Sequence, residues 1–283
     1  MAEIRERRLE TGAVSINYAE IGDGSPLVIL HGGSARWQHL ESLVRELADR
    51  WHVYAPDLRG HGRSGHVSKR YRLTDYADDI VAFLERVTGP AAVFGHSLGG
   101  QVALVAAARR PDLVNALAIG DAPLSTSRLR KGLQKTRPML EEWRDLAASS
   151  RSTDEIADAL RAMWVPEFEG RSGRAAELLP TASPWFDFMA GCLHELDPSM
   201  LDAVIEFDEM HRGFEPGLLA KISCRVLLVQ ADPKRGGGLS DEDVALARSL
   251  RPDLQVGRIS EAGHSLYPYR IGPVLREFFA DRA

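Results

Sequence analysis

The sequence predicts an α/β fold: a mostly parallel, twisted sheet with helices on both faces. Short, continuous apolar runs recur along the chain, each long enough for one buried strand, at residues 26–33, 52–57, 91–95, 114–121, 224–232 and 253–260. Helical patterns lie between them, at about 37–49, 74–87, 98–109, 241–250 and 271–281. Strands that are apolar throughout are typical of parallel sheets, because helices cover both faces of such sheets.

The first strand of this sheet has a different pattern. Residues 13–20, AVSINYAE, alternate apolar and polar side chains, which is typical of a half-buried strand. The preceding residues 5–12, RERRLETG, could supply its hairpin partner. We therefore expect an antiparallel pair at the start of the chain, followed by the parallel strands.

The alternation of strands and helices is interrupted between about residues 123 and 220. This stretch has no convincing strand, and helical patterns occur near 127–148, 153–163, 172–179 and 198–210, separated by Pro166, Gly170, Pro180 and Pro184. We predict a core domain of residues 1–122 and 221–283, with residues 123–220 forming a helical lid inserted between strands 6 and 7. A lid is favoured because ligand crevices in open α/β sheets lie at the carboxyl ends of the strands. A helical extension packed on the side of the sheet is the alternative.

Composition excludes several classes of partner. The chain has 283 residues, of which 44% are hydrophobic and 27% charged, as is typical of a soluble globular protein. A formal net charge of -5 gives no concentrated positive field for nucleic acid or an anionic membrane. Cys192 and Cys224 lie far apart and indicate free thiols in a reducing compartment. With no apolar run of signal-peptide or membrane-spanning length, we expect a cytoplasmic protein, and the oligomeric state stays open.

A candidate nucleophile lies between a predicted strand and a predicted helix. Residues 95–99, GHSLG, fit the pattern G-x-S-x-G, whose serine sits on a sharp strand-to-helix turn. The glycines on either side of Ser97 leave room for that turn, so the hydroxyl can project above the sheet. A serine that merely caps the helix is the alternative.

A serine hydroxyl needs a neighbouring base before it becomes a good nucleophile. Among the histidines, His264 is the best candidate, because it lies in a loop directly after the last predicted strand. His96 adjoins Ser97, and in so tight a turn its ring should point elsewhere. His31 and His61 are better explained by structural hydrogen bonds. We therefore predict His264 as the base.

A carboxylate must hold the histidine in the correct tautomer. Asp232 and Asp121 each end a predicted strand, and both satisfy the chain order serine, acid, histidine. We favour Asp232 and keep Asp121 as the first alternative. The remaining candidates are Asp241, Glu242 and Asp243.

The oxyanion of an acyl-transfer reaction needs preorganised N–H donors near the serine. The backbone N–H of Leu98 follows the nucleophile at the start of a helix. We assign the second donor to Gly33, in the loop His31-Gly32-Gly33-Ser34, where glycines let the backbone come close. By itself, this loop would be read as a flexible turn.

Taken together, these segments resemble the α/β-hydrolase fold superfamily in its lid-bearing branch. The resemblance rests on LHGG (30–33), PDLRGHGRS (56–64), GHSLGG (95–100), the acid after LLVQ, and AGH (262–264), and covers residues 13–281. It implies that Asp57 and Arg59 make local hydrogen bonds and are not catalytic. One departure concerns the acid: relatives often place it three residues after a glycine, whereas here Ala231 replaces the glycine and Lys234 follows.

The resemblance also implies a reaction. Relatives that open epoxides or displace halide carry aspartate at the elbow, so Ser97 indicates acyl transfer onto water. We expect a serine hydrolase for a small, apolar carboxylic ester or lactone, requiring no cofactor and no metal. Hydrolysis of carbon-carbon bonds, perhydrolysis, and a ligand receptor without turnover are the alternatives. Apolar side chains of the insertion could line a substrate pocket or form the lid's own core; they are Trp143, Met163, Trp164, Phe168, Trp185, Phe186, Phe188 and Met189.

Overall fold

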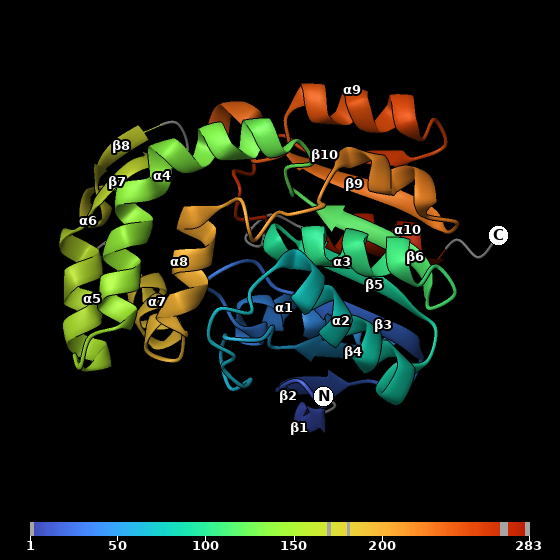
Figure 1. Ribbon diagram of the computed structural model, residues 1–283, viewed down its shortest axis with the longest axis horizontal. Helices are drawn as coiled ribbons and strands as arrows, with labels where there is room; N and C mark the ends of the chain where they lie inside the picture. Colours follow the sequence, from blue (N-terminus) through green and yellow to red (C-terminus); the bar gives the residue numbers. More distant parts are fainter. Residues whose placement is uncertain (1–2, 169–170, 180–181, 267–270, 281–283) are drawn as a thin grey trace.

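An eight-stranded sheet forms the centre of the molecule (Figure 1). The computed structural model describes residues 3–168, 171–179, 182–266 and 271–280. The sheet order is β1-β2-β4-β3-β5-β6-β9-β10. These strands are β1 (Arg5–Glu10), β2 (Ser15–Ile21), β3 (Ser25–Leu30), β4 (Trp51–Pro56), β5 (Ala91–His96), β6 (Val114–Gly120), β9 (Arg225–Ala231) and β10 (Gln255–Ile259). β1 pairs with β2, and β2 with β4, in antiparallel fashion, and the other neighbours are parallel. The predicted mostly parallel sheet is confirmed.

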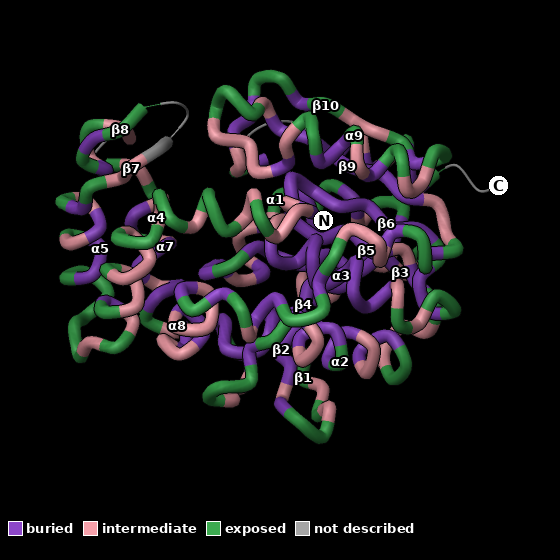
Figure 2. Tube along the Cα trace, turned by 45° about the horizontal axis from the view of Figure 1, so that its top comes forward, coloured by how far each residue is buried: buried purple, intermediate pink, exposed green. Residues whose placement is uncertain are grey.

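Helices cover both faces of this sheet. They are η1 (Trp37–Leu40), α1 (Glu41–Leu47), α2 (Leu73–Phe83), η2 (Leu84–Thr88), α3 (Leu98–Arg109), η3 (Pro216–Lys221), η4 (Pro233–Arg235), α9 (Asp241–Leu250) and α10 (Ile271–Ala280). Alternate residues of β3 enter different cores: Val28 and Leu30 pack in the cluster that contains α2 and α3. Leu27 and Ile29 pack in the cluster with α1 and α10. All four are fully buried, as Figure 2 shows for the central strands, so this part of β3 is covered on both faces.

The insertion leaves the sheet after β6 and returns at β9, the sixth and seventh strands of the large sheet in chain order. Figure 1 shows its elements, green to gold, grouped beside the sheet. They are α4 (Thr126–Ala147), α5 (Thr153–Ala162), β7 (Trp164–Phe168), β8 (Arg171–Arg174), α6 (Ala175–Leu178), α7 (Pro184–His194) and α8 (Pro198–Glu206). The division into a core domain and a lid at residues 122 and 221 stays a prediction.

The insertion is not entirely helical, which corrects the expectation that it lacks strands. β7 and β8 form a two-stranded antiparallel sheet, in which Trp164 faces Arg174 and Val165 faces Gly173. The helical pattern expected over 172–179 holds only for the four residues of α6. Two short strands that pair only with each other give a weak sequence signal, because neither is covered on both faces.

Helix α7 is a second difference from the expectation, since Pro184 was interpreted only as a separator. Pro184 is the first residue of the helix, and the hydroxyl of Ser183 accepts a hydrogen bond from the backbone N–H of Trp185. Proline is favoured at the first position of a helix, because a backbone N–H there would have no partner within the helix and its absence costs no hydrogen bond. Here proline therefore marks the beginning of a helix.

A buried ion pair ties the loop after β4 to α2. Nε of Arg59 lies 2.6 Å from Oδ2 of Asp79, and Nη2 lies 2.8 Å from Oδ1. Both side chains are 3% exposed. Arg59 also donates to the carbonyl oxygen of Arg70, so it makes structural hydrogen bonds, as the resemblance implied.

Removing the acid of this pair is expected to destabilise the fold strongly. Asp79→Ala leaves the Arg59 guanidinium buried without its counter-ion, which costs about 3–5 kcal/mol in the free energy of unfolding. Asp78→Ala is the matched control, because Asp78 is 65% exposed and its partner Arg109 lies at the surface; we expect a loss below about 1 kcal/mol. Urea denaturation measures both, and equal losses would contradict the assignment.

In the described part of the chain, no helix combines the length and the apolar character needed to cross a membrane.

Candidate active site

Ser97 occupies a strained turn between β5 and α3. Its backbone has φ +52° and ψ -118°, a conformation that costs a residue other than glycine about 1–3 kcal/mol. A Cβ on Gly99 would lie 2.5 Å from the carbonyl oxygen of His31, and one on Gly95 would overlap the carbonyl of Gly99. The hydroxyl of Ser97 makes no helix-capping hydrogen bond. The glycines therefore permit the sharp turn, as expected, and the serine is not there as a cap.

The hydroxyl of Ser97 contacts a histidine from the far end of the chain. Nε2 of His264 lies 2.9 Å from Oγ of Ser97, and Nδ1 of the same ring lies 2.7 Å from Oδ2 of Asp121. A carboxylate only accepts hydrogen bonds, so Nδ1 carries the proton and donates it to Asp121. In the neutral ring, Nε2 then accepts from the Ser97 hydroxyl. The three side chains form one continuous chain of hydrogen bonds.

Asp121 is fully buried and surrounded by backbone N–H groups. Oδ1 accepts from Ala231 and Leu239, at 3.1 and 3.2 Å, and Oδ2 accepts from Gly238 at 2.6 Å. Burial by itself would raise the pKa of Asp121, but the hydrogen bond and charge of His264, together with the amides, outweigh it, so the pKa is lowered. Asp121 is thus held as a carboxylate.

Asp232, the acid favoured from the sequence, lies elsewhere. Its side chain accepts from the backbone N–H of Lys234 at 2.9 Å and caps the short helix η4. Its own N–H donates to the carbonyl oxygen of Ala262, in the loop that leads to His264. Within the described residues, the carboxylate that bonds His264 is that of Asp121, the first alternative from the sequence. The physical reason is the path of the loop after β9, which turns its amides toward Asp121 and the Asp232 carboxylate toward its own backbone.

A glycine run in that loop is the signal that sequence reasoning missed. A Cβ on Gly238 would lie 3.1 Å from Nδ1 of His264 and 3.1 Å from the carbonyl oxygen of Asp121. The loop Gly236-Gly237-Gly238 can therefore approach the acid and the histidine closely enough to donate its N–H. Asp121 itself has φ +43°, so it too sits in a strained turn, directly after β6. The remaining candidates lie in α9: Asp243 binds Arg128, and Asp241 binds Arg258.

The two predicted oxyanion donors lie side by side. A Cβ on Gly33 would lie 3.8 and 3.9 Å from two side-chain carbons of Leu98, and one on Gly32 would lie 3.4 Å from Cβ of Ser97. Neither the Gly33 nor the Leu98 amide donates to another described residue. The structure thus places Gly33 beside Leu98, the residue that follows Ser97, and the part of their amides in holding an oxyanion stays a prediction.

His31 and His61 make structural hydrogen bonds, as expected. Nδ1 of His31 lies 2.7 Å from the carbonyl oxygen of Gly32, and Nε2 accepts from Leu58. Nε2 of His61 accepts from Ser34. Burial lowers the pKa of both rings, that of His61 to about 4. The rings stay neutral and support the loop that carries Gly33.

Three of the apolar side chains singled out in the insertion are buried in the hydrophobic core. Met163, Phe186 and Met189 lie in the large cluster that also contains side chains of β3, α2 and α3, which favours a role in packing over a pocket lining. Phe188 is different: its ring lies 5.5 Å from the ring of His39, in the segment that follows Gly33. Trp164 is 60% exposed. The side chain of Phe168 lies outside the described residues.

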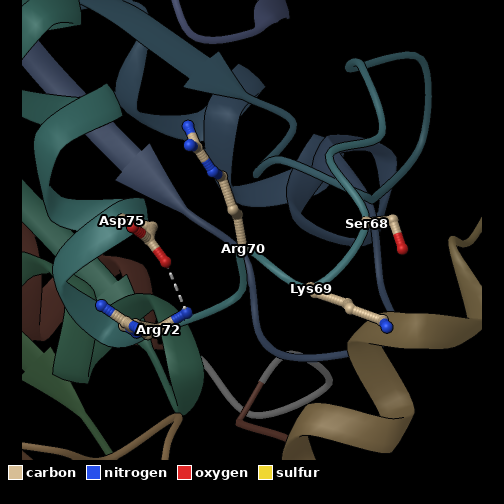
Figure 3. Close-up of a pocket in the computed structure, with 5 residues that line it drawn as sticks. All are labelled: Ser68, Lys69, Arg70, Arg72 and Asp75. Atoms are coloured by element: carbon tan, nitrogen blue, oxygen red, sulfur yellow. Dashed lines mark hydrogen bonds between the residues drawn. The ribbon is translucent and has the colours of Figure 1, made fainter.

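A surface hollow of about 440 Å³ lies before α2, away from the reactive residues. Figure 3 shows its lining, with the backbone N–H of Arg72 bonded to Asp75. The other lining residues are Ser68, Lys69 and Arg70. Since none of these residues contacts Ser97 or His264, the hollow is not part of the candidate active site.

Comparisons with known proteins give the same fold. Residues 25–177 match the family described as alpha/beta hydrolase fold. A 2-(acetamidomethylene)succinate hydrolase of Mesorhizobium japonicum is 38% identical over 112 residues, 39% of this chain and 40% of that protein. A pyrrolizixenacetamide deacetylase of Xenorhabdus hominickii is 32% identical over 151 residues, 51% of this chain and 53% of that protein. The matched regions thus span only about half or less of these relatives.

Solved structures extend the likeness to nearly the whole chain. The crystal structure of E-2-(acetamidomethylene)succinate hydrolase has a TM-score of 0.75 at 23% identity, covering 99% of this chain and all of that one. The enol-lactonase from Burkholderia xenovorans LB400 has a TM-score of 0.72 at 14% identity, covering 97% and 100%. Identities this low speak for the fold alone. With a family match over more than half of its length, this chain belongs to the alpha/beta hydrolase fold family.

Proposed function

We propose that the protein is a serine hydrolase that cleaves a small, apolar carboxylic ester or lactone through an acyl-enzyme intermediate. The observation that carries the proposal is the chain of hydrogen bonds from Asp121 through His264 to Ser97. A serine, a histidine and a carboxylate in this order activate the hydroxyl for attack on a carbonyl carbon. The partner is a small-molecule substrate, and neither a metal nor an organic cofactor has a role in these steps.

The proposed reaction has two halves, acylation and deacylation of Ser97. Ser97 attacks the carbonyl carbon while Nε2 of His264 takes its proton, and the amides of Gly33 and Leu98 hold the oxyanion. His264 then returns the proton to the leaving alkoxide, and the acyl group stays on Ser97. Water attacks the acyl-enzyme while His264 takes its proton; His264 then gives that proton to Oγ of Ser97 as the bond between Oγ and the acyl carbon breaks, which releases the carboxylic acid. Asp121 orients His264 and stabilises the imidazolium that forms in both halves.

An amide is the second candidate for the bond that is cleaved. Two relatives, at 38% and 32% identity, are named for hydrolysis of an acetamidomethylene succinate and for deacetylation. An amide and an ester pass through the same tetrahedral intermediate, so the same three residues serve both. The bond with the better leaving group should react faster, which favours the ester as the diagnostic substrate.

A substrate panel tests the proposal. We expect turnover of p-nitrophenyl acetate and of a simple lactone, measured as release of p-nitrophenol and of acid. An N-acetyl anilide, a ring-fission β-diketone and peroxide-dependent perhydrolysis form the other arms. Turnover of the diketone or perhydrolysis alone would replace the proposal by one of those reactions, and binding without turnover of any compound would favour a receptor.

A further inference from the structure

The residue before the nucleophile contacts the backbone of the catalytic histidine. Nε2 of His96 lies 2.7 Å from the carbonyl oxygen of His264. A carbonyl oxygen only accepts, so Nε2 of His96 carries the proton and donates it. The two imidazole centroids are 5.0 Å apart. His96 therefore joins the elbow directly to the loop that carries the base, a separation of 168 residues along the chain.

His96 also lies against the loop His31-Gly32-Gly33-Ser34. A Cβ on Gly32 would lie only 3.0 Å from Nδ1 of His96, so glycine at this position leaves room for the ring. The side chain of His96 thus contacts the loop that carries His264 and the loop that carries Gly33, while its own backbone continues into Ser97. Attack and oxyanion binding require these three segments to be correctly placed relative to one another.

The ring of His96 is suited to a fixed, uncharged role. It is 4% exposed, and burial, followed by the nearby His264, lowers its pKa to about 3. A neutral ring keeps the donor at Nε2 through the working pH range. It also adds no positive charge beside His264, which itself becomes an imidazolium during the reaction.

Within the described residues, the loop that carries His264 has few other backbone hydrogen bonds close to the histidine. Upstream, the carbonyl oxygen of Ala262 accepts from Asp232, and Ala262 donates to Ile259. The side chain of His264 is 41% exposed, so packing around the ring is incomplete. Its bonds to Ser97 and Asp121 orient the ring, but they do not by themselves fix the backbone from which it projects.

We propose that His96 is a positioning residue: its hydrogen bond fixes the main chain of His264 and thereby sets the distance between Nε2 of His264 and Oγ of Ser97. This inference rests on the proposed function, because it assigns His96 a part in the same reaction. In this proposal His96 acts through the main chain of His264. Its effect comes from near-attack geometry, where a displacement of about 1 Å can cost about 100-fold in rate.

Two amide substitutions at position 96 separate the effect of the hydrogen-bond donor from the effect of the imidazole ring. The amide nitrogen of glutamine reaches about as far from the backbone as Nε2 of histidine, whereas that of asparagine stops near the position of Nδ1. With p-nitrophenyl acetate, we expect His96→Asn to lower kcat by about 100-fold with KM changed less than about threefold. His96→Gln should recover most of that loss. The rate of labelling by a fluorophosphonate probe should follow kcat in both variants.

His211→Leu is the matched control. His211 is also buried, and its Nδ1 lies 3.0 Å from the carbonyl oxygen of Phe207, but it lies after α8 and contacts none of the reactive residues. Removing this bond should leave kcat within about threefold of the parent. Thermal unfolding of all variants shows that each is folded at the assay temperature.

The outcomes distinguish this inference from the proposed function. Full activity in His96→Asn, or equal losses in His96→Asn and His96→Gln, would overturn the positioning role while Ser97→Ala is inactive. Undiminished turnover in Ser97→Ala would refute the proposed function itself, whatever the His96 variants do.

Discussion

Ser97→Ala is expected to abolish ester hydrolysis, with kcat reduced by about 10⁶-fold. The substitution removes the oxygen that forms the acyl-enzyme in the proposed reaction and leaves His264 without the hydroxyl that it contacts at 2.9 Å. Hydrolysis of p-nitrophenyl acetate and labelling by a fluorophosphonate probe measure the effect, and both should fall to background.

The fold should survive this change. Alanine removes one oxygen from a side chain that makes no helix-capping bond, so the unfolding midpoint should stay close to that of the parent. Ser125→Ala is a matched control: its hydroxyl caps α4 by accepting from the backbone N–H of Arg128 and also bonds Ser127, and we expect activity to persist. Residual labelling of Ser97→Ala at the parental rate would show that the probe reacts at another nucleophile.

Asp121→Asn is expected to lower kcat by about 10⁴-fold, whereas Asp232→Asn should leave kcat within about threefold of the parent. An asparagine at 121 cannot stabilise the imidazolium, and its amide can hold His264 in the wrong tautomer. The side chain of Asp232 accepts from the backbone N–H of Lys234, within its own turn, so the amide variant leaves the bonds among Asp121, His264 and Ser97 in place.

Comparing the two variants under identical conditions decides which acid acts. Because both replace a carboxylate with an amide of nearly the same size, steric effects are matched. Loss of turnover in Asp232→Asn alone would mean that the acid is Asp232 and that the bond between His264 and Asp121 is structural. The pH dependence of kcat/KM for each variant provides a second readout of the same assignment.

The sheet could be predicted because the evidence for it is local. Continuous apolar runs such as 26–33 and 224–232 indicate strands buried on both faces, and the glycines around Ser97 indicate a sharp turn. Ser97 and His264 were accordingly predicted at positions that the structure brings together. The acid was not, because Asp121 and Asp232 both end strands and fit the same chain order. Only the three-dimensional path of the loop after β9 separates them.

The insertion was harder to predict for a different reason. Its elements are short, and several begin with residues that usually break structure: Pro184 starts α7 and Pro198 starts α8. Proline at a helix start and proline between helices look the same in sequence. β7 and β8 pair with each other in a separate two-stranded sheet, so neither has the continuous apolar run of a central strand.

The placement of Asp121 at the end of β6 constrains how the insertion can be exchanged. Asp121 continues directly into the insertion, and its carboxylate accepts from one amide at the end of β9 and two in the loop that follows. A chimera that receives a foreign insertion must therefore keep both the first junction and residues 231–239 as one unit. If the acid followed the seventh strand instead, the junction after the sixth strand could vary freely. The positions at which two such proteins can be recombined therefore depend on which strand carries the acid.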